Sequence, residues 1–409
     1  MANIYGIEYL RHKLNSKRER VNKRYQFYEL KNIAKDFHIS TPPSLEGFQS
    51  VVGWCAKSVD TLGDRLAFNE FRNDNFDLNG IYALNNPDVL FDSAVLSALI
   101  SSCCFICISP DADGFPRLQV IDGGNATGII DPITNMLTEG YAVLDRDQYG
   151  QPTEEAYFLP YRTEYYTKGE KAAVVVNHKA PYALLVPIIY RPDAKRPFGH
   201  SRISRAQMSI VGSALRTIKR SEIAAEFYSY PQKWVTGLSD DVEIADKWRA
   251  SMSSLITLTK DEDGDHPIMG QFQQQTMGPH TEQLKMFASL FAGEAGLTLD
   301  DLGFPTSNPA SAESIKAAHD NLRLTARKAQ RGFGSGFLNA GFLAACLRDN
   351  YEYKRNQLYL TRPVWEPIFE PDSGMLSAIG DGVIKINQAV DGYVSEDMLG
   401  DLTGLKREG

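Results

Sequence analysis

The sequence predicts an α+β protein that is mainly helical, and three observations support this prediction. In residues 103–190, apolar and polar positions alternate with a period near two, which is typical of strands. After Pro192, apolar residues recur at three- and four-residue steps in two long segments, which is typical of amphipathic helices. Residues 8–35 and 48–68 show helical patterns as well. We therefore expect helices on both sides of a β-rich module.

The chain has 409 residues, of which 43% are hydrophobic and 23% are charged. This length suits two or three domains with a substantial core, and the composition is that of a globular protein. The formal net charge of -8 argues against a protein whose whole surface binds nucleic acid. It is compatible with a surface along which DNA slides, because repulsion from the phosphates prevents the DNA from sticking.

Two segments bear on where the protein works. The N-terminal stretch MANIYGIEYL contains a glutamate and lacks the basic-then-apolar order of a signal peptide. The longest apolar run, residues 94–109, is broken by serines and is too short to span a bilayer. We expect a protein that stays in the compartment where it is made, or that enters an assembly formed there.

The five cysteines are too few and too unevenly placed for a disulfide scaffold, which favours a cytosolic origin. Cys104 and Cys107 have the two-residue gap of a zinc knuckle, but no second pair of Cys or His residues lies near them in the sequence. We interpret the cysteines as buried structural residues and expect no metal or other cofactor. They are Cys55, Cys103, Cys104, Cys107 and Cys346.

The first expected helix has a basic face, with seven Lys or Arg residues against one Glu between residues 11 and 24. This face is either solvated or in contact with a nucleic acid or an acidic partner. Pro42 and Pro43 interrupt the helical pattern. The next helix, within residues 48–68, directs an apolar stripe toward a core. The residues of that stripe are Val52, Cys55, Val59, Leu62 and Leu66.

In the β-rich module, turn motifs separate short runs of strand character. One of these motifs, GGNATG, is rich in glycine but lacks the Lys and Ser/Thr of a P-loop, so an ATPase of that class is not expected. The turn motifs are DADG, DGGNATG, DPITN and DQYGQP.

The first long helical segment after the strands is preceded by the stretch KRPFGHSRISR. Pro197 and Gly199 predict a turn, and Ser201 or Ser204 is expected to cap the helix. Ser204 and Gln207 have the spacing of a capping box. Up to residue 229 the helix carries one apolar stripe and one basic stripe. The apolar stripe contains Ile203, Ile210, Val211, Ala214, Leu215, Ile218 and Ala225.

The second long segment begins where Asn308 can cap a helix and Pro309 suits its first position. Its apolar residues keep a helical spacing over a length of about 58 Å, at about 1.5 Å per residue. A helix of this length suggests packing along a neighbouring subunit. Gly332, Gly334 and Gly336 interrupt the pattern, and we interpret them as a kink or a close helix contact.

An insert separates the two long segments. Residues 239–255 predict a short helix with acids in its first turn, and residues 255–272 predict a β-hairpin around an Asp-Gly turn. A helix over 281–295 follows, and Gly296 is expected to end it. Residues 240–313 hold thirteen acidic and four basic residues. They form either a solvated acidic surface or the negative lining of a channel.

Taken together, these residues resemble the portal proteins of tailed bacteriophages, in particular siphophage portals of the kind found in actinobacterial phages. The resemblance covers roughly residues 50 to 350, in order along the chain. The most specific stretch is GLTLDDLGFPTSNPASAESIKAAHDNL, and the next most specific is RPFGHSRISR. The matching stretches are VDTLGDRLAFNEF, DPITNMLTEGYAVL, VPIIYRPDAKRPFGHSRISRAQMS, EIAAEFYSYPQKWVTG, DGDHPIMGQF and GLTLDDLGFPTSNPASAESIKAAHDNL.

The resemblance implies a dodecameric ring at one capsid vertex, whose channel passes double-stranded DNA during packaging and ejection. It also implies the parts of the portal fold. These are a wing at 1–195, a stem helix at 196–229, a clip (short helix plus β-hairpin) at 230–280, a second stem helix at 281–295, a tunnel loop at 296–308, the long helix and wing return at 309–369, and a small crown at 370–409.

The partners implied are other copies of the chain, the major capsid protein, a scaffold protein, the terminase large subunit, the head-tail adaptor and double-stranded DNA of any sequence, with no membrane. The expected location is the portal vertex of the virion, after synthesis in the cytoplasm of the bacterial host. The protein would be a passive gate without covalent chemistry, while the motor supplies the work.

Candidate functional residues follow from matching these parts. The tunnel loop would place Asp300, Asp301, Phe304, Thr306 and Asn308 at the DNA channel. The basic face of the stem would consist of Arg202, Arg205, Arg216, Lys219 and Arg220. The last three would either pair with acids on a neighbouring subunit or face the channel wall. The clip would contact partners through Trp234, Asp240, Asp241, Trp248 and Arg249.

Two other functions compete with this interpretation. A hydrolase would use His200 beside Ser201, but adjacent side chains rarely give triad geometry and no Gly-x-Ser-x-Gly elbow is present. A nucleic-acid-binding scaffold protein that is not a portal would use the basic N-terminal helix. It would remain a monomer, which separates it from a ring.

Overall fold

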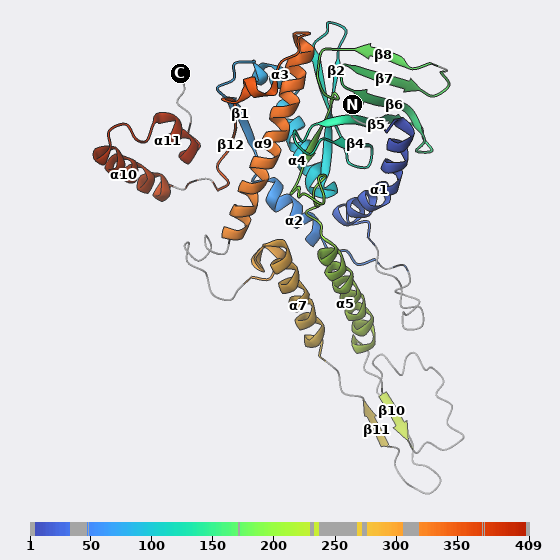
Figure 1. The fold of residues 1–409 in the computed structure, drawn as a ribbon. Helices are drawn as coiled ribbons and strands as arrows, with labels where there is room; N and C mark the ends of the chain where they lie inside the picture. Colours follow the sequence, from blue (N-terminus) through green and yellow to red (C-terminus); the bar gives the residue numbers. More distant parts are fainter. Residues whose placement is uncertain are drawn as a thin grey trace.

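The computed structural model combines a body of helices and sheets with a pair of long helices, which project from the body toward a two-stranded ribbon (Figure 1). The predicted mixture of helix and sheet is confirmed. Within the described residues, no helix is both long and apolar enough to cross a membrane. The structure describes residues 5–32, 47, 49–170, 172–229, 233–236, 268–271, 276–305, 319–369, 371 and 373–405.

The β-rich module contains two antiparallel sheets, with strand orders β3-β2-β9 and β4-β5-β6-β7-β8. The predicted turns lie between these strands, and their aspartates accept hydrogen bonds from backbone N–H groups of the same turn, as Asp111 does from Phe115. The strands are β2 Cys103–Pro110, β3 Pro116–Ile121, β4 Ala126–Ile130, β5 Leu137–Arg146, β6 Pro152–Leu159, β7 Arg162–Thr167, β8 Val174–Asn177 and β9 Leu185–Ile189.

The first helix, α1, spans Ile7–Tyr28, and much of its basic face contacts the chain itself. Lys13 and Lys17 each donate a hydrogen bond of 2.8 Å to a carbonyl of β4. Arg11 forms an ion pair with Glu155 of β6. Burial lowers the pKa of the Lys17 ammonium, which is a cost that these contacts offset. The β-rich module of the same chain therefore partly covers these three cations, where the sequence left open a solvated face or a contact with a nucleic acid or an acidic partner.

Three further helices precede these two sheets, and all three contribute buried side chains to the main core. The predicted apolar stripe of α2 is confirmed, since Cys55, Val59 and Leu62 are fully buried. Helix α4 begins with Pro at its first turn, where the missing N–H needs no partner. The helices are α2 Trp54–Gly63, α3 Leu78–Ala83 and α4 Pro87–Ser101.

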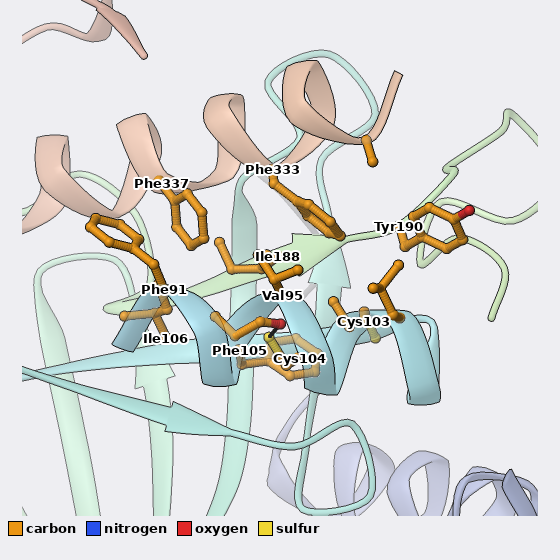
Figure 2. Close-up of a cluster of buried hydrophobic side chains, with 14 of the residues drawn as sticks. Phe91, Val95, Cys103, Cys104, Phe105, Ile106, Ile188, Tyr190, Phe333 and Phe337 are labelled. Atoms are coloured by element: carbon orange, nitrogen blue, oxygen red, sulfur yellow. Dashed lines mark hydrogen bonds between the residues drawn. The ribbon is translucent and has the colours of Figure 1, made fainter. Parts of the chain in front are cut away.

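The main core lies where α4 and the long helix α9 meet the three-stranded sheet (Figure 2). Phe91 of α4 and Phe337 of α9 meet edge to face, with ring centroids 4.7 Å apart. Ile188 of β9 and Val95 of α4 lie beside them (Figure 2). These side chains come from residues far apart in the sequence, so the core joins the N-terminal and C-terminal parts of the body.

Helix α9 spans Asp320–Arg348, and its apolar residues pack inside this chain. The expectation that this stripe packs along a neighbouring subunit is therefore wrong for the described part. The predicted start at Asn308 and Pro309 lies outside the described residues. The glycines do not interrupt the helix but allow close contacts, since a Cβ on Gly334 would lie 2.7 Å from a carbon of Pro363.

The cysteines are all buried and form no disulfide, as the sequence predicts. The Cys104 thiol donates a hydrogen bond of 3.1 Å to the carbonyl of Ala94. Burial raises the pKa of Cys55 and of Cys107 to about 12, which keeps these thiols protonated at neutral pH. Cys104 and Cys107 thus have the buried surroundings of structural cysteines.

The C-terminal part adds a small sheet and two helices beside the body. Strand β12 (Arg362–Trp365) pairs with β1 (Phe68–Arg72) and follows the short 3-10 helix η3 (Arg355–Leu358). Helices α10 (Ser373–Ala389) and α11 (Glu396–Thr403) follow, within the residues expected to form a small crown. A cavity of about 680 Å³ separates them from the β1–β12 sheet.

Candidate functional site: the projecting helices and the adjoining loop

The projecting helices are α5 (Arg205–Ser229) and α7 (Gly278–Ala295), which we call the stem pair. They run side by side from the body, in opposite chain directions (Figure 1). The Thr217 hydroxyl donates a hydrogen bond of 3.0 Å to Gln283 of α7, which fixes the register of the two helices. The 3-10 helix η2 (Asp300–Leu302) follows at the body end of α7.

The start of α5 has the predicted capping box. The Ser204 hydroxyl accepts the N–H of Gln207 at 3.1 Å, and the Gln207 side chain accepts the N–H of Ser204 at 3.1 Å. Two backbone donors of the first turn are thereby satisfied. The short segment before the helix therefore fixes where the stem pair leaves the body.

His200 and Ser201 are neighbours in sequence but have different partners. The Nε2 atom of His200 lies 2.6 Å from a carboxylate oxygen of Asp193, within an exposed turn. The Ser201 hydroxyl is buried, donates to the carbonyl of Ile100 at 2.6 Å and accepts the N–H of Ile203. The serine therefore has no base to activate it, and the hydrolase alternative loses its geometry.

Arg202 does not belong to the predicted basic face, because it precedes α5 and is 8% exposed. Its guanidinium donates to the carbonyl of Ser58 in α2 at 3.2 Å and to the carbonyl of Ala295 at the end of α7. Burial lowers the pKa of this arginine, and the backbone oxygens satisfy its donors. Arg202 thus links the body to both helices of the stem pair.

The other four cations of the predicted basic face lie on α5, but one of them is buried. Arg205, Arg216 and Arg220 are exposed and lie on one side of the helix, because they are eleven and four residues apart. Lys219 is 2% exposed, so it does not lie on the exposed basic face with the other three. The described basic face therefore consists of three arginines.

The loop after α7 begins at Gly296, whose φ of 64° is the left-handed conformation that glycine adopts without strain. Asp301 then accepts the N–H and the hydroxyl of Thr298, each at 2.9 Å, and has the role of a cap. Asp300 is exposed, whereas Asp301 is only partly exposed. The two acids predicted as equivalent channel residues therefore have different surroundings.

The remaining loop residues divide between the core and the part that the structure leaves undescribed. Phe304 packs against the main core, so it is a packing residue rather than a free contact for a ligand. Thr306 and Asn308 lie outside the described residues.

Of the proposed clip contacts, the structure describes only the backbone of Trp234. This residue lies in β10 (Lys233–Thr236) and pairs with Gly270 of β11 (Ile268–Gln271). The predicted hairpin within 255–272 is described only in this second strand, whose partner here is β10. The predicted helix at 239–255 lies outside the described ranges, as do Asp240, Asp241, Trp248 and Arg249.

The sequence contains one signal that pattern reasoning missed. Thr298 and Asp301 have the spacing of a capping box, which would have indicated a local structural role for the second acid. The buried position of Arg202 had no such signal, because its partners lie 144 and 93 residues away in the chain.

The chain is similar over most of its length to two curated phage proteins. It is 22% identical over 379 residues to the portal protein of Mycobacterium phage L5, covering 88% of this chain and 77% of that protein. It is 24% identical over 389 residues to the portal protein of Mycobacterium phage D29, with the same coverage of both chains. No family model matches the chain.

Solved structures with a similar course of the chain come from gene transfer agent particles. The neck of an empty particle, computed with C6 symmetry, gives a TM-score of 0.49 at 14% identity, covering 87% of this chain and 90% of that one. The neck of a native particle, computed with C12 symmetry, gives 0.46 at 15% identity with the same coverage.

Proposed function

We propose that the chain is a portal protein of the kind found in tailed bacteriophages, and that it forms a ring at one vertex of the capsid. The ring would enclose the channel through which double-stranded DNA enters during packaging and leaves during ejection. The observation that carries the proposal is the alignment of 88% of this chain with two curated portal proteins.

The architecture supports this proposal in one respect. A ring subunit with a central channel needs a broad body, a narrower connecting region and an end that meets other proteins. The body, the stem pair and the β10–β11 ribbon follow one another in this order (Figure 1). We assign the wing to 1–195, the stem to 196–229 and 281–295, the clip to 230–280, the tunnel loop to 296–308, the long helix and wing return to 309–369, and the crown to 370–409.

The partners follow from this arrangement. The clip end, farthest from the body, would meet the terminase large subunit during packaging and the head-tail adaptor afterwards. The body would contact the major capsid protein and the scaffold protein. The ring would be assembled in the host cytoplasm and remain in the virion. The DNA would pass through the channel without sequence preference, because its backbone is the same at every step.

The protein would act without covalent chemistry. The motor would supply the work, and the ring would guide the DNA and change conformation as the DNA passes. The thirteen acidic residues against four basic ones in 240–313 suit this role, since a negative lining of the channel would not trap phosphates.

The test is the mass and shape of the purified protein. One chain has a mass of 45.6 kDa, and a dodecamer has twelve times this mass. Light scattering after gel filtration should give a mass of this order, and particle images along the symmetry axis should show a ring with a central hole. A persistent monomer at high concentration, also in the presence of the scaffold protein, would contradict the proposal.

A further inference from the structure

One face of α5 is left uncovered and carries small residues between two cations. Arg205, Ser209, Gly212 and Arg216 follow one another at steps of four, three and four residues, so they form one stripe. Space is open at its centre, since a Cβ on Gly212 would meet no atom within 4 Å. The stripe lies opposite the buried face of α5, to which Val211 belongs.

One face of α7 is uncovered as well, and it carries large apolar residues between two acids. Glu282, Met286 and Leu290 follow at steps of four residues, and Glu294 comes four residues later. Met286 is 49% exposed and Leu290 is 53% exposed. Side chains of this kind are seldom left so exposed in a row, so this face is a candidate contact surface.

The charges at the ends of both stripes lack ionic partners in the described part of the chain. Arg205, Glu282 and Glu294 form no ion pair with any described residue. Arg216 donates a hydrogen bond of 3.0 Å to the Ser213 hydroxyl of its own helix and forms no ion pair there. These four groups are therefore available to a partner.

The two stripes match in height along the stem pair. Thr217 bonds Gln283 near one end, and Arg202, three residues before Arg205, bonds Ala295 at the other. The helices are antiparallel, so moving toward the body means lower residue numbers in α5 and higher residue numbers in α7. Twelve residues from Thr217 toward the body lies Arg205, and twelve residues from Gln283 toward the body lies Ala295. At about 1.5 Å per residue both steps measure about 18 Å.

Four pairs of groups thereby come to equal heights. Arg205 lies level with Glu294, and Arg216 lies level with Glu282 within about one turn. Between these charges, Ser209 and Gly212 lie at the heights of Leu290 and Met286. Positive charge thus corresponds to negative charge, and a shallow notch corresponds to two large side chains.

We propose that α5 of each subunit packs against α7 of the next subunit around the ring, with Met286 and Leu290 in the notch at Ser209 and Gly212. This inference rests on the proposed ring. Neighbouring subunits of a ring are related by a rotation about the ring axis, which does not change the height of an atom along that axis. Groups at equal height on α5 and α7 can therefore meet when α5 of one subunit lies beside α7 of the next. Contacts between two different faces are those that close a ring.

Cross-linking tests the pairing directly. The double variant Ser209→Cys with Leu290→Cys should give, after mild oxidation of assembled rings, a ladder of covalent multimers on a denaturing gel. The native cysteines are buried and do not compete. The control pairs Ser209→Cys with Asp113→Cys, which lies on an exposed turn of the body, and should give no ladder. Rings that assemble but yield only monomeric bands for the first variant would overturn the inference.

Charge reversal tests the ends of the stripes. Glu282→Lys should weaken ring assembly by about two- to fivefold for each interface, which is the effect of one partly exposed ion pair. Adding Arg216→Glu should restore assembly. Asp113→Lys is the matched control and should leave assembly unchanged. Thermal unfolding of the monomers shows whether each variant still folds, and a double variant no better than Glu282→Lys would contradict the pairing.

The outcomes separate this inference from the proposed function. If the wild-type chain forms rings, but the double-cysteine variant does not cross-link and the charge-reversal variants assemble like the wild type, the interface is wrong and the ring stands. If the wild-type chain stays monomeric under all conditions, the proposed function and this interface both fail.

Discussion

Two neighbouring acids on the loop after α7 have different tasks. Asp301 accepts two hydrogen bonds from Thr298, so Asp301→Ala should loosen the loop and lower the free energy of unfolding by about 1 kcal/mol. Asp300 is more exposed, and Asp300→Ala should lower the free energy of unfolding by less, within about 0.5 kcal/mol of the wild type. Urea unfolding measures both effects. Equal destabilisation by the two variants would contradict the division of tasks.

Of the two acids, Asp300 is the better candidate for a residue that faces DNA in the channel. If the loop lines the channel, Asp300→Lys should impair packaging in intact rings by attracting phosphates. Asp301→Lys is less informative, because it removes the hydrogen bonds from Thr298 and adds a positive charge at the same time. A packaging defect of this variant could have either cause. Unchanged packaging by Asp300→Lys rings would remove Asp300 from the DNA path.

His178 should make the body sensitive to acid. The residue is 6% exposed, its Nδ1 accepts the N–H of Ala180 at 3.2 Å, and burial lowers its pKa from 6.5 to about 4. Between these values the unfolded chain binds a proton that the folded chain does not bind. The stability that the neutral ring contributes is therefore complete above pH 6.5 and is lost as the pH falls toward 4.

The expected loss from this group is about 2–3 kcal/mol between pH 7 and pH 4.5. His178→Asn removes the titrating ring and keeps an acceptor for the N–H of Ala180. Unfolding free energies of the wild type and this variant, measured at both pH values, give the contribution by difference, since the carboxylates act alike in both. Equal pH dependence of the two chains would show that His178 is not responsible.

At the scale of elements, the glycines of α9 give a matched pair of substitutions. A Cβ on Gly332 would lie 3.6 Å from its nearest neighbour, the carbonyl of Ile189. Gly332→Ala should therefore stabilise the protein by about 0.5–1 kcal/mol through helix propensity. A Cβ on Gly334 would lie 2.7 Å from the ring of Pro363, so Gly334→Ala should cost about 1–3 kcal/mol.

Denaturant midpoints of the two alanine variants should move in opposite directions. A gain in stability from Gly334→Ala would mean that α9 and β12 are not in close contact. A loss from Gly332→Ala would mean that this turn of α9 has a neighbour where the structure leaves room.

The elements themselves were well predicted wherever local spacing defines them. The buried stripe of α2, the strands of the module with their aspartate turns, the capping box of Ser204 and the stop at Gly296 are confirmed. Each of these depends on residues within a few positions of one another. The partner of α9 was predicted less well, because the same apolar stripe suits the chain's own core and a neighbouring subunit.

At the scale of the whole molecule, the C-terminal helices should be separable from the body. Helix α10 has no buried residue, and the cavity beside it shows loose packing against the β1–β12 sheet. A chain that ends at Phe369 should therefore unfold within a few degrees of the full chain. Thermal unfolding followed by circular dichroism measures this, and a large fall of the midpoint would show that α10 and α11 stabilise the body.

The resemblance to portal proteins, which came from an ordered set of stretches, is confirmed by the two curated relatives. The division into wing, stem, clip, tunnel loop and crown stays a prediction, as do the DNA and partner contacts. The sequence suggested a stem with five cations on one face. The structure keeps three of them on the surface of α5.

The sequence by itself determined the order of helices and strands and the caps and turns, since these depend on spacing along the chain. The resemblance to portal proteins came from an ordered set of similar stretches. Only the tertiary structure decided which charged residues are available. Lys13, Lys17 and Arg202 satisfy backbone carbonyls of elements distant in the sequence. Burial is a property of the assembled core, and no local pattern contains it.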